Sequence, residues 1–101
     1  MTNMTKELIK ILKTVTDPEL GCDVWNLGLI YAVSFDTKSG IASLAMTFTS
    51  PNCPVADQIL SDIITKIKTH PTVADVVMDI VWTPKWSESM ASEEIQLEMS
   101  W

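Results

Sequence analysis

The chain of 101 residues is 47% hydrophobic and 20% charged, and its formal net charge is -6. This length and composition predict a single globular domain over residues 1–101 and argue against a disordered chain. All seven basic residues are lysines. Because the forked arginine donor is absent, we expect neither nucleic-acid nor membrane binding. The N-terminus has no signal-peptide or membrane-span pattern and the two cysteines fit reduced thiols, so we expect a cytoplasmic protein.

The spacing of apolar residues predicts the secondary structure in chain order. A first helix is expected to begin with Thr5 as its N-cap and to end near Thr14. Two strands joined by a hairpin loop, a helix and a third strand are expected over residues 29–35, 41–48, 55–67 and 76–82. Ser92 is the expected start of a short C-terminal helix.

The connections between these elements predict the fold. Strands joined by a hairpin pair antiparallel, whereas a strand-helix-strand unit favours a right-handed parallel crossover. The sequence therefore predicts an α+β fold, a small two-layer sandwich of order α-β-β-α-β with a mixed three-stranded sheet and a short C-terminal helix. Antiparallel pairing also places the start of the first strand beside the end of the second. We therefore expect the polar loops at these two points to converge.

A lone thiol lies in segment 47–54, between the second strand and the following helix. Cys53 comes at or just before the predicted helix start, and Pro54 suits the first helical position. The unpaired N–H groups and the dipole of a helix start stabilise negative charge, which favours the thiolate that binds metals. The alternative is that Cys53 is an ordinary buried apolar residue.

Three acidic residues and a second thiol, Cys22, follow the first helix in the turn-rich segment 16–23. Asp17 and Glu19 flank Pro18 and can face one pocket, as metal ligands or as an acid and base pair. The alternative is that Asp17 caps a turn that the proline initiates.

Four short motifs follow one another along the chain: Thr-Asp-Pro-Glu-Leu at 16–20, Asn-Leu-Gly-Leu-Ile-Tyr at 26–31, Met-Thr-Phe-Thr-Ser-Pro-Asn-Cys-Pro at 46–54, and Val-Trp-Thr-Pro-Lys-Trp at 81–86, with Met90 after it. Together they resemble the signatures of the iron-sulfur assembly domain family, which includes SufT, PaaD-like and eukaryotic cytosolic iron-sulfur targeting proteins. The resemblance covers essentially the whole chain. It implies a small α/β domain with this order of elements. It also implies an auxiliary role in the assembly of iron-sulfur clusters or their delivery to proteins, without enzymatic turnover.

The resemblance also implies a functional site. The reactive cysteine of the family maps to Cys53. The residues expected to line the site with it are Asp17, Glu19, Thr49, Ser50 and Asn52. Cys22 departs from the family, many of whose members have an aliphatic residue at this position, and is a candidate second thiol.

Cluster chemistry limits what Cys53 can do. An iron-sulfur cluster usually needs four thiolates, and one chain has two cysteines. The implied cofactor is therefore a transient cluster. It is held either by Cys53 in a symmetric homodimer, with or without Cys22, or by Cys53 as one exchangeable ligand, with Asp17 or Glu19 assisting. Zinc is disfavoured because the chain has no C-x-x-C pair. The implied partners are client apoproteins and other iron-sulfur assembly factors.

Two other functions remain open at this point. In a thiol-dependent enzyme Cys53 would be the nucleophile, but the only histidine, His70, comes at the far end of the central helix. In an adaptor, or in an accessory component of a PaaD-like multicomponent oxygenase, Trp86 and Trp101 would bind the partner. These tryptophans cover the sheet instead if they belong to the core.

Overall fold

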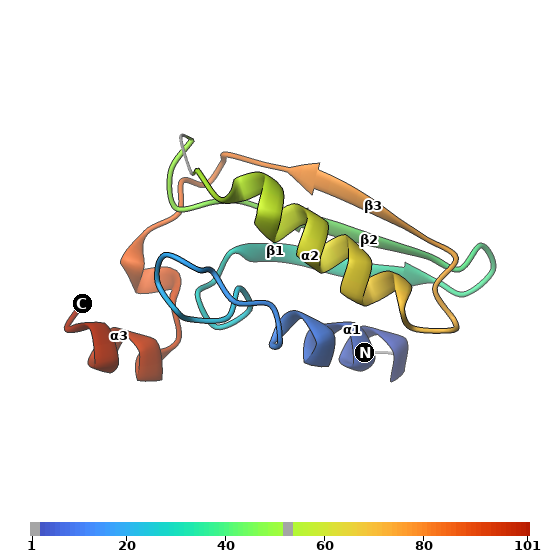
Figure 1. Ribbon diagram of the computed structural model, residues 1–101, viewed down its shortest axis with the longest axis horizontal. Coiled ribbons are helices and arrows are strands. Elements are labelled where there is room, and N and C mark those ends of the chain that lie inside the picture. The colour runs from blue at the N-terminus through green and yellow to red at the C-terminus, as the bar shows by residue number, and fades with distance from the viewer. Residues whose placement is uncertain (1–2, 52–53) are drawn as a thin grey trace.

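The computed structural model describes residues 3–51 and 54–101. Its elements are α1 (Asn3–Leu12), β1 (Ile30–Asp36), β2 (Ile41–Met46), α2 (Ala56–Lys68), β3 (Asp75–Ile80), a 3-10 helix (Glu88–Met90) and α3 (Glu93–Met99). β2 is the central strand, antiparallel to β1 and parallel to β3. Figure 1 shows α2 as the crossover between the two parallel strands. The predicted α+β fold, with its mixed three-stranded sheet and C-terminal helix, is confirmed.

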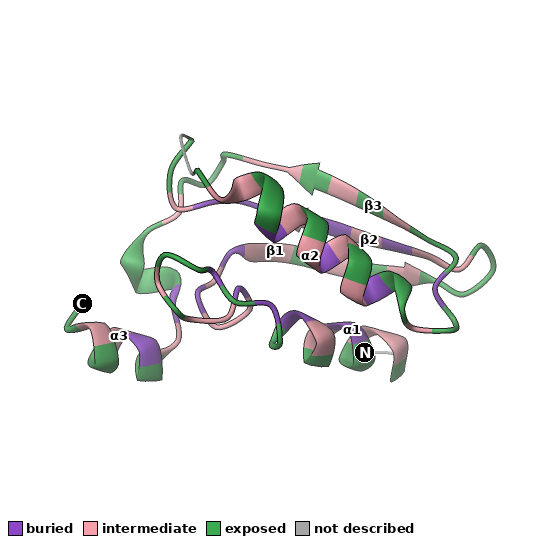
Figure 2. Ribbon diagram, in the orientation of Figure 1, coloured by how far each residue is buried: buried purple, intermediate pink, exposed green. Residues whose placement is uncertain are grey.

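The core lies between one face of the sheet and the two longer helices. Every second side chain of β2 is buried. α2 buries Ile59, Ile63 and Ile67, which lie four residues apart and share one face of the helix, and α1 buries Leu8 and Leu12 in the same way. In Figure 2 the buried parts of α2 face the sheet, and α1 packs against β1 and α2. Burial of each such side chain stabilises the fold by about 1.5–3 kcal/mol.

Two predicted helix starts are wrong. α1 begins at Asn3, so Thr5 lies inside the helix and is not its cap. α2 begins at Ala56 with Val55 as N-cap, so Pro54 precedes the cap and does not occupy the first helical position. Apolar spacing identifies the body of a helix, whereas its first residue depends on local backbone angles that the spacing does not encode.

The C-terminal segment packs against the turn that precedes β1 and is hydrogen-bonded to it. The indole N–H of Trp86 donates to the carbonyl oxygen of Leu27 at 2.8 Å. Gly28 has a φ of +78°, and a Cβ added there would collide with the carbonyl oxygen of Met90. A glycine is therefore needed at this position both for the left-handed backbone and for the close approach. No helix of the described chain is both long and apolar enough to cross a membrane.

Candidate functional site

The segment between α1 and β1 begins with a tight loop closed by backbone hydrogen bonds. Thr16 and Asp23 form an isolated antiparallel bridge. The N–H of Asp17 donates to the carbonyl oxygen of Cys22 at 2.9 Å, and the N–H of Gly21 donates to the carbonyl oxygen of Asp17 at 2.8 Å. The loop therefore holds its acidic residues and its thiol within one short chain reversal.

The carboxylate of Asp17 is a structural acceptor inside this loop. Asp17 is only 3% exposed, and its Oδ1 atom accepts the N–H groups of Glu19 at 2.8 Å and Leu20 at 3.4 Å. This is the turn-capping arrangement, one of the two alternatives that the sequence left open. Glu19 is exposed. The two carboxylates therefore lie in different environments, one engaged with the backbone and the other open to solvent.

The second predicted site segment follows β2. The N–H of Thr47 donates to the carbonyl oxygen of Leu29 at 2.9 Å, which joins the start of this segment to the residue just before β1. Thr49 is half-buried and Ser50 is exposed. Figure 1 shows the loop after α1 and the segment after β2 at the same end of the sheet. The antiparallel pairing of β1 and β2 produces this placement, as expected.

Asn52 and Cys53 lie outside the described residues, so their predicted roles stay predictions. The helix that follows them is described: it begins at Ala56 and has Asp57 in its first turn. A carboxylate in the first turn interacts favourably with the helix dipole. The negative charge of Asp57 therefore offsets part of the dipole effect that was expected to stabilise a Cys53 thiolate.

Cys22 lines a cavity that the sequence did not predict. The cavity has a volume of about 340 Å³ and lies between the loop after α1 and helix α3. Its charged and thiol-bearing lining residues are Lys13, Cys22, Asp23, Glu94 and Glu98. Neither the polar loop nor the short amphipathic helix carries a local signal for their contact, so the cavity becomes visible only in the folded chain.

The environment of Cys22 favours its neutral form. The half-buried thiol donates to the carbonyl oxygen of Leu20 at 3.6 Å. Burial is the main cause of a raised pKa at Cys22, and the carboxylates of Glu98, Asp23 and Asp17 add to it. Since the thiolate is the form that binds metals, this setting disfavours Cys22 as a cluster ligand. Within residues 3–51 and 54–101, no three His, Cys, Asp or Glu side chains are placed to hold a metal ion together.

The two tryptophans predicted to bind a partner contact each other. Their ring centroids are 5.8 Å apart, with an angle of 75° between the planes. Trp86 is half-buried and its N–H is already bonded to Leu27, whereas Trp101 is 38% exposed. Trp86 is therefore anchored within the molecule, and Trp101 offers the more accessible ring.

The structure is a small α+β domain with two polar segments at one end of its sheet. Residues 5–78 match the family described as iron-sulfur cluster assembly protein, and the chain belongs to this family. The family predicted from the four sequence motifs is thus confirmed.

Similar proteins match nearly the full length of the chain. The Fe-S protein maturation auxiliary factor of Porphyromonas gingivalis is 39% identical over 94 residues, which are 93% of this chain and 89% of that protein. The Fe-S protein maturation auxiliary factor SufT of Staphylococcus aureus is 39% identical over 85 residues, 84% of this chain and 96% of that protein. A crystal structure of a domain of unknown function from Bacillus anthracis superposes with a TM-score of 0.89 at 38% identity and covers 95% of this chain and 91% of that one.

Proposed function

We propose that the protein is an auxiliary factor in the maturation of iron-sulfur proteins, which helps to assemble clusters or to deliver them to client apoproteins together with other assembly factors. The observation that carries this proposal is the match of almost the whole chain to relatives named Fe-S protein maturation auxiliary factors. We further propose that it acts without enzymatic turnover. The cytoplasmic location and the homodimer expected from the sequence stay predictions.

The proposed chemical group is the thiol of Cys53, as one exchangeable ligand of the transferred cluster. A cluster usually needs four ligands, whereas the chain has two thiols, and the raised pKa of Cys22 disfavours its thiolate. The cluster is therefore cargo, and its other ligands come from a second copy, a donor or the client. Of the acidic pair, Glu19 is exposed and available to assist, while the carboxylate of Asp17 is bonded to the loop backbone.

Anaerobic reconstitution with iron and sulfide tests the ligand assignment. Wild type, Cys53→Ser and Cys22→Ser are compared by visible absorbance, iron content and oligomeric mass. We expect a sulfur-to-iron charge-transfer band in the wild type and in Cys22→Ser, and its loss in Cys53→Ser. A band that disappears in Cys22→Ser as well would instead support a site of four thiols in a homodimer.

Activation of a purified [4Fe-4S] apoprotein tests the delivery function separately. Loaded wild type is expected to restore client activity faster than iron and sulfide alone, and Cys53→Ser is expected to lose this advantage. Equal activation by Cys53→Ser, together with loss of client binding in Trp101→Ala, would contradict the carrier function and favour an adaptor.

A further inference from the structure

Strand β3 lies at an edge of the sheet, and its outer side has no strand partner in the described part of the chain. It is the last strand in the order β1-β2-β3 and, among the described residues, pairs with β2 alone. The N–H of Val81 donates to the carbonyl oxygen of Met46 at 2.8 Å. Since alternate residues of a parallel ladder bond to the same neighbour, the main-chain groups of Met78 and Ile80 face away from β2. In Figure 1, β3 forms the upper margin of the sheet.

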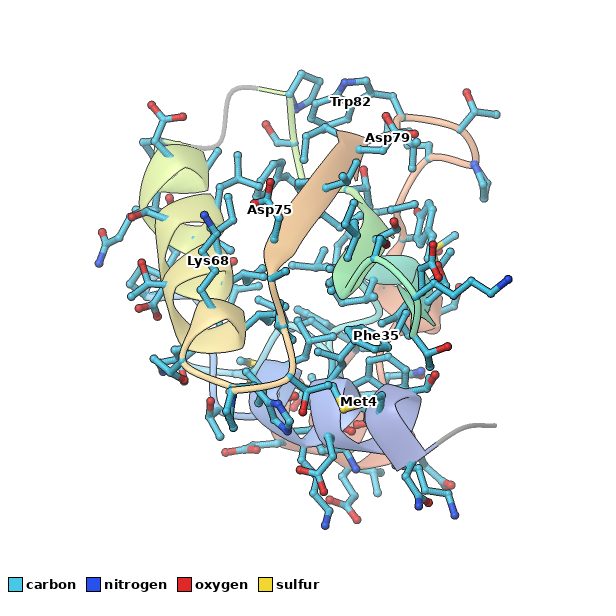
Figure 3. The ribbon with its side chains drawn as sticks, turned by 90° about the vertical axis from the view of Figure 1, so that its right-hand side faces the viewer. Met4, Phe35, Lys68, Asp75, Asp79 and Trp82 are labelled. Carbon is cyan, nitrogen blue, oxygen red and sulfur yellow. The ribbon has the colours of Figure 1, made fainter. Side chains whose placement is uncertain are left out.

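The exposed side chains of this edge alternate in chemistry. They are Asp75, Val77 and Asp79, and Val77 is 51% exposed. The carboxylate of Asp75 lies 3.4 Å from the ammonium group of Lys68, whereas Asp79 has no ion-pair partner in the described part of the chain. In Figure 3, Asp79 lies on the side of β3 that faces away from α2, and Asp75 lies toward Lys68. The edge therefore offers an unpaired anion beside an exposed apolar side chain.

The neighbouring strand has small side chains beside this part of β3. The residues of β2 that pair with Val77 and Asp79 are Ser43 and Ala45, both half-buried with small side chains. These small side chains of β2 do not cover Asp79, which is exposed.

A second copy of the chain fits this edge poorly. Antiparallel self-pairing centred on Val77 would place Asp75 opposite Asp79 of the other copy. Antiparallel pairing centred on Met78 would place Asp79 opposite Val77 of the other copy. Asp79 would then lie diagonally between Asp75 and Asp79 of that copy. Like charges across a strand pair are destabilising, and the net charge of -6 adds a general repulsion. The charge of the edge is complementary to a basic strand.

We propose that the free edge of β3 is a docking site for an extended segment of a partner protein that has basic side chains at alternate positions and an apolar one between them. The segment adds a fourth strand to the sheet, with its main chain bonded to Met78 and Ile80. Its basic side chain pairs with Asp79, and its apolar side chain packs on Val77. This proposal is independent of the role of Cys53.

A synthetic heptapeptide, Thr-Lys-Thr-Val-Thr-Lys-Thr, tests the proposal by NMR titration of the isotope-labelled protein. Its palindromic order presents the same side chains whether it binds parallel or antiparallel to β3. We expect saturable shifts concentrated at the amides of residues 76–81. Asp79→Lys is expected to weaken the affinity about fivefold or more, since it replaces a cross-strand attraction by a repulsion.

Two controls separate strand addition from general charge attraction. Glu7→Lys changes the net charge by the same amount as Asp79→Lys but lies on α1, and it should leave the affinity unchanged. The peptide Thr-Glu-Thr-Val-Thr-Glu-Thr should bind Asp79→Lys more tightly than wild type.

Three results would overturn the proposal: no shifts at millimolar peptide, equal weakening by both lysine variants, or shifts centred on the acidic residues around α3. A dimer of the wild type in sedimentation, with protection of the amides of β3, would assign the edge to a second copy instead.

Discussion

At the scale of single residues, two glycines with the same backbone conformation differ in what surrounds them. Gly21 has a φ of +74° and nothing within 4 Å of an added Cβ, whereas Gly28 has a φ of +78° and the backbone of Met90 in that space. Gly21→Ala is expected to lower the free energy of unfolding by about 1 kcal/mol, the cost of the left-handed backbone. Gly28→Ala adds a collision and is expected to cost about 3 kcal/mol or more.

Urea denaturation of both variants measures this difference. Because Gly28→Ala must push away the segment that carries Trp86, the emission of the tryptophans is also expected to change in this variant and not in Gly21→Ala. Equal losses of stability would show that the approach of Met90 to Gly28 is not a tight contact.

The buried carboxylate of Asp17 allows a second prediction at this scale. Asp17→Ala would leave the N–H groups of Glu19 and Leu20 without their acceptor, and we expect a loss of about 1–2 kcal/mol in the free energy of unfolding. Asp17→Asn keeps an acceptor oxygen and should cost less, as measured by the same urea titration. If Asp17→Asn also delivers clusters like the wild type, the role of Asp17 is structural. Loss of delivery in a stable Asp17→Asn protein would make the charge itself functional.

At the scale of the elements, Trp86 contributes more than Trp101 to attaching the C-terminal segment to the rest of the fold. Trp86→Phe removes the hydrogen bond to Leu27, whose carbonyl oxygen then lacks this donor. We expect a loss of about 1–2 kcal/mol in the free energy of unfolding and faster proteolysis of the C-terminal segment. Trp101→Phe keeps an aromatic ring beside Trp86 and is expected to change stability by less than about 0.5 kcal/mol. Similar losses in the two variants would contradict this assignment.

The bodies of the elements could be predicted because their residues share one face. Ile59, Ile63 and Ile67 repeat at helical spacing, and buried and half-buried residues alternate along β2. The starts of α1 and α2 could not be predicted in the same way. The cap of α2, Val55, offers no side-chain acceptor that would identify it in the sequence.

In the candidate site, too, the local features could be predicted from the sequence and the long-range contacts could not. The turn-capping role of Asp17 follows from a local pattern of Asp and Pro, and the structure shows it. The cavity at Cys22 depends on the docking of α3, which buries Ile95 against the rest of the core. Such a contact joins segments about 70 residues apart in the chain, and no local periodicity encodes it.

At the scale of the whole molecule, the lowered pKa values of two carboxylates predict how the free energy of unfolding decreases at acidic pH. The backbone N–H of Lys38 is the main cause of a lowered pKa at Asp36, and that of Val76 is the main cause at Asp75. A carboxylate with a lowered pKa in the folded state stabilises the fold above its ordinary pKa of about 3.9. This contribution is lost as the pH falls through the folded pKa. We therefore expect the urea midpoint to decline below about pH 4.

At alkaline pH the relevant pKa values are raised instead of lowered, so the free energy of unfolding decreases as the pH rises. Cys22 has a raised pKa, mainly because of burial. Its contribution is complete below the ordinary thiol pKa of about 8.5 and is lost as the pH rises through the folded value. Burial also raises the pKa of Tyr31, which extends the decline. Urea midpoints from pH 2 to 11 test both decreases, and Cys22→Ser is expected to flatten the start of the alkaline one. An unchanged alkaline decrease in Cys22→Ser would contradict this account.

The mixed pairing of the sheet also sets the order in which its strands can assemble. β1 and β2 meet at Asp36 and Ile41, 5 residues apart (41 − 36), whereas β2 and β3 meet at Ile41 and Asp75, 34 residues apart (75 − 41). Closing the longer loop costs about 1.7 kcal/mol more chain entropy. We therefore expect the hairpin to form first and β3 to pair with β2 only after α2 has formed between them. The strand expected to enter the sheet last is thus the one whose outer side has no strand partner among the described residues.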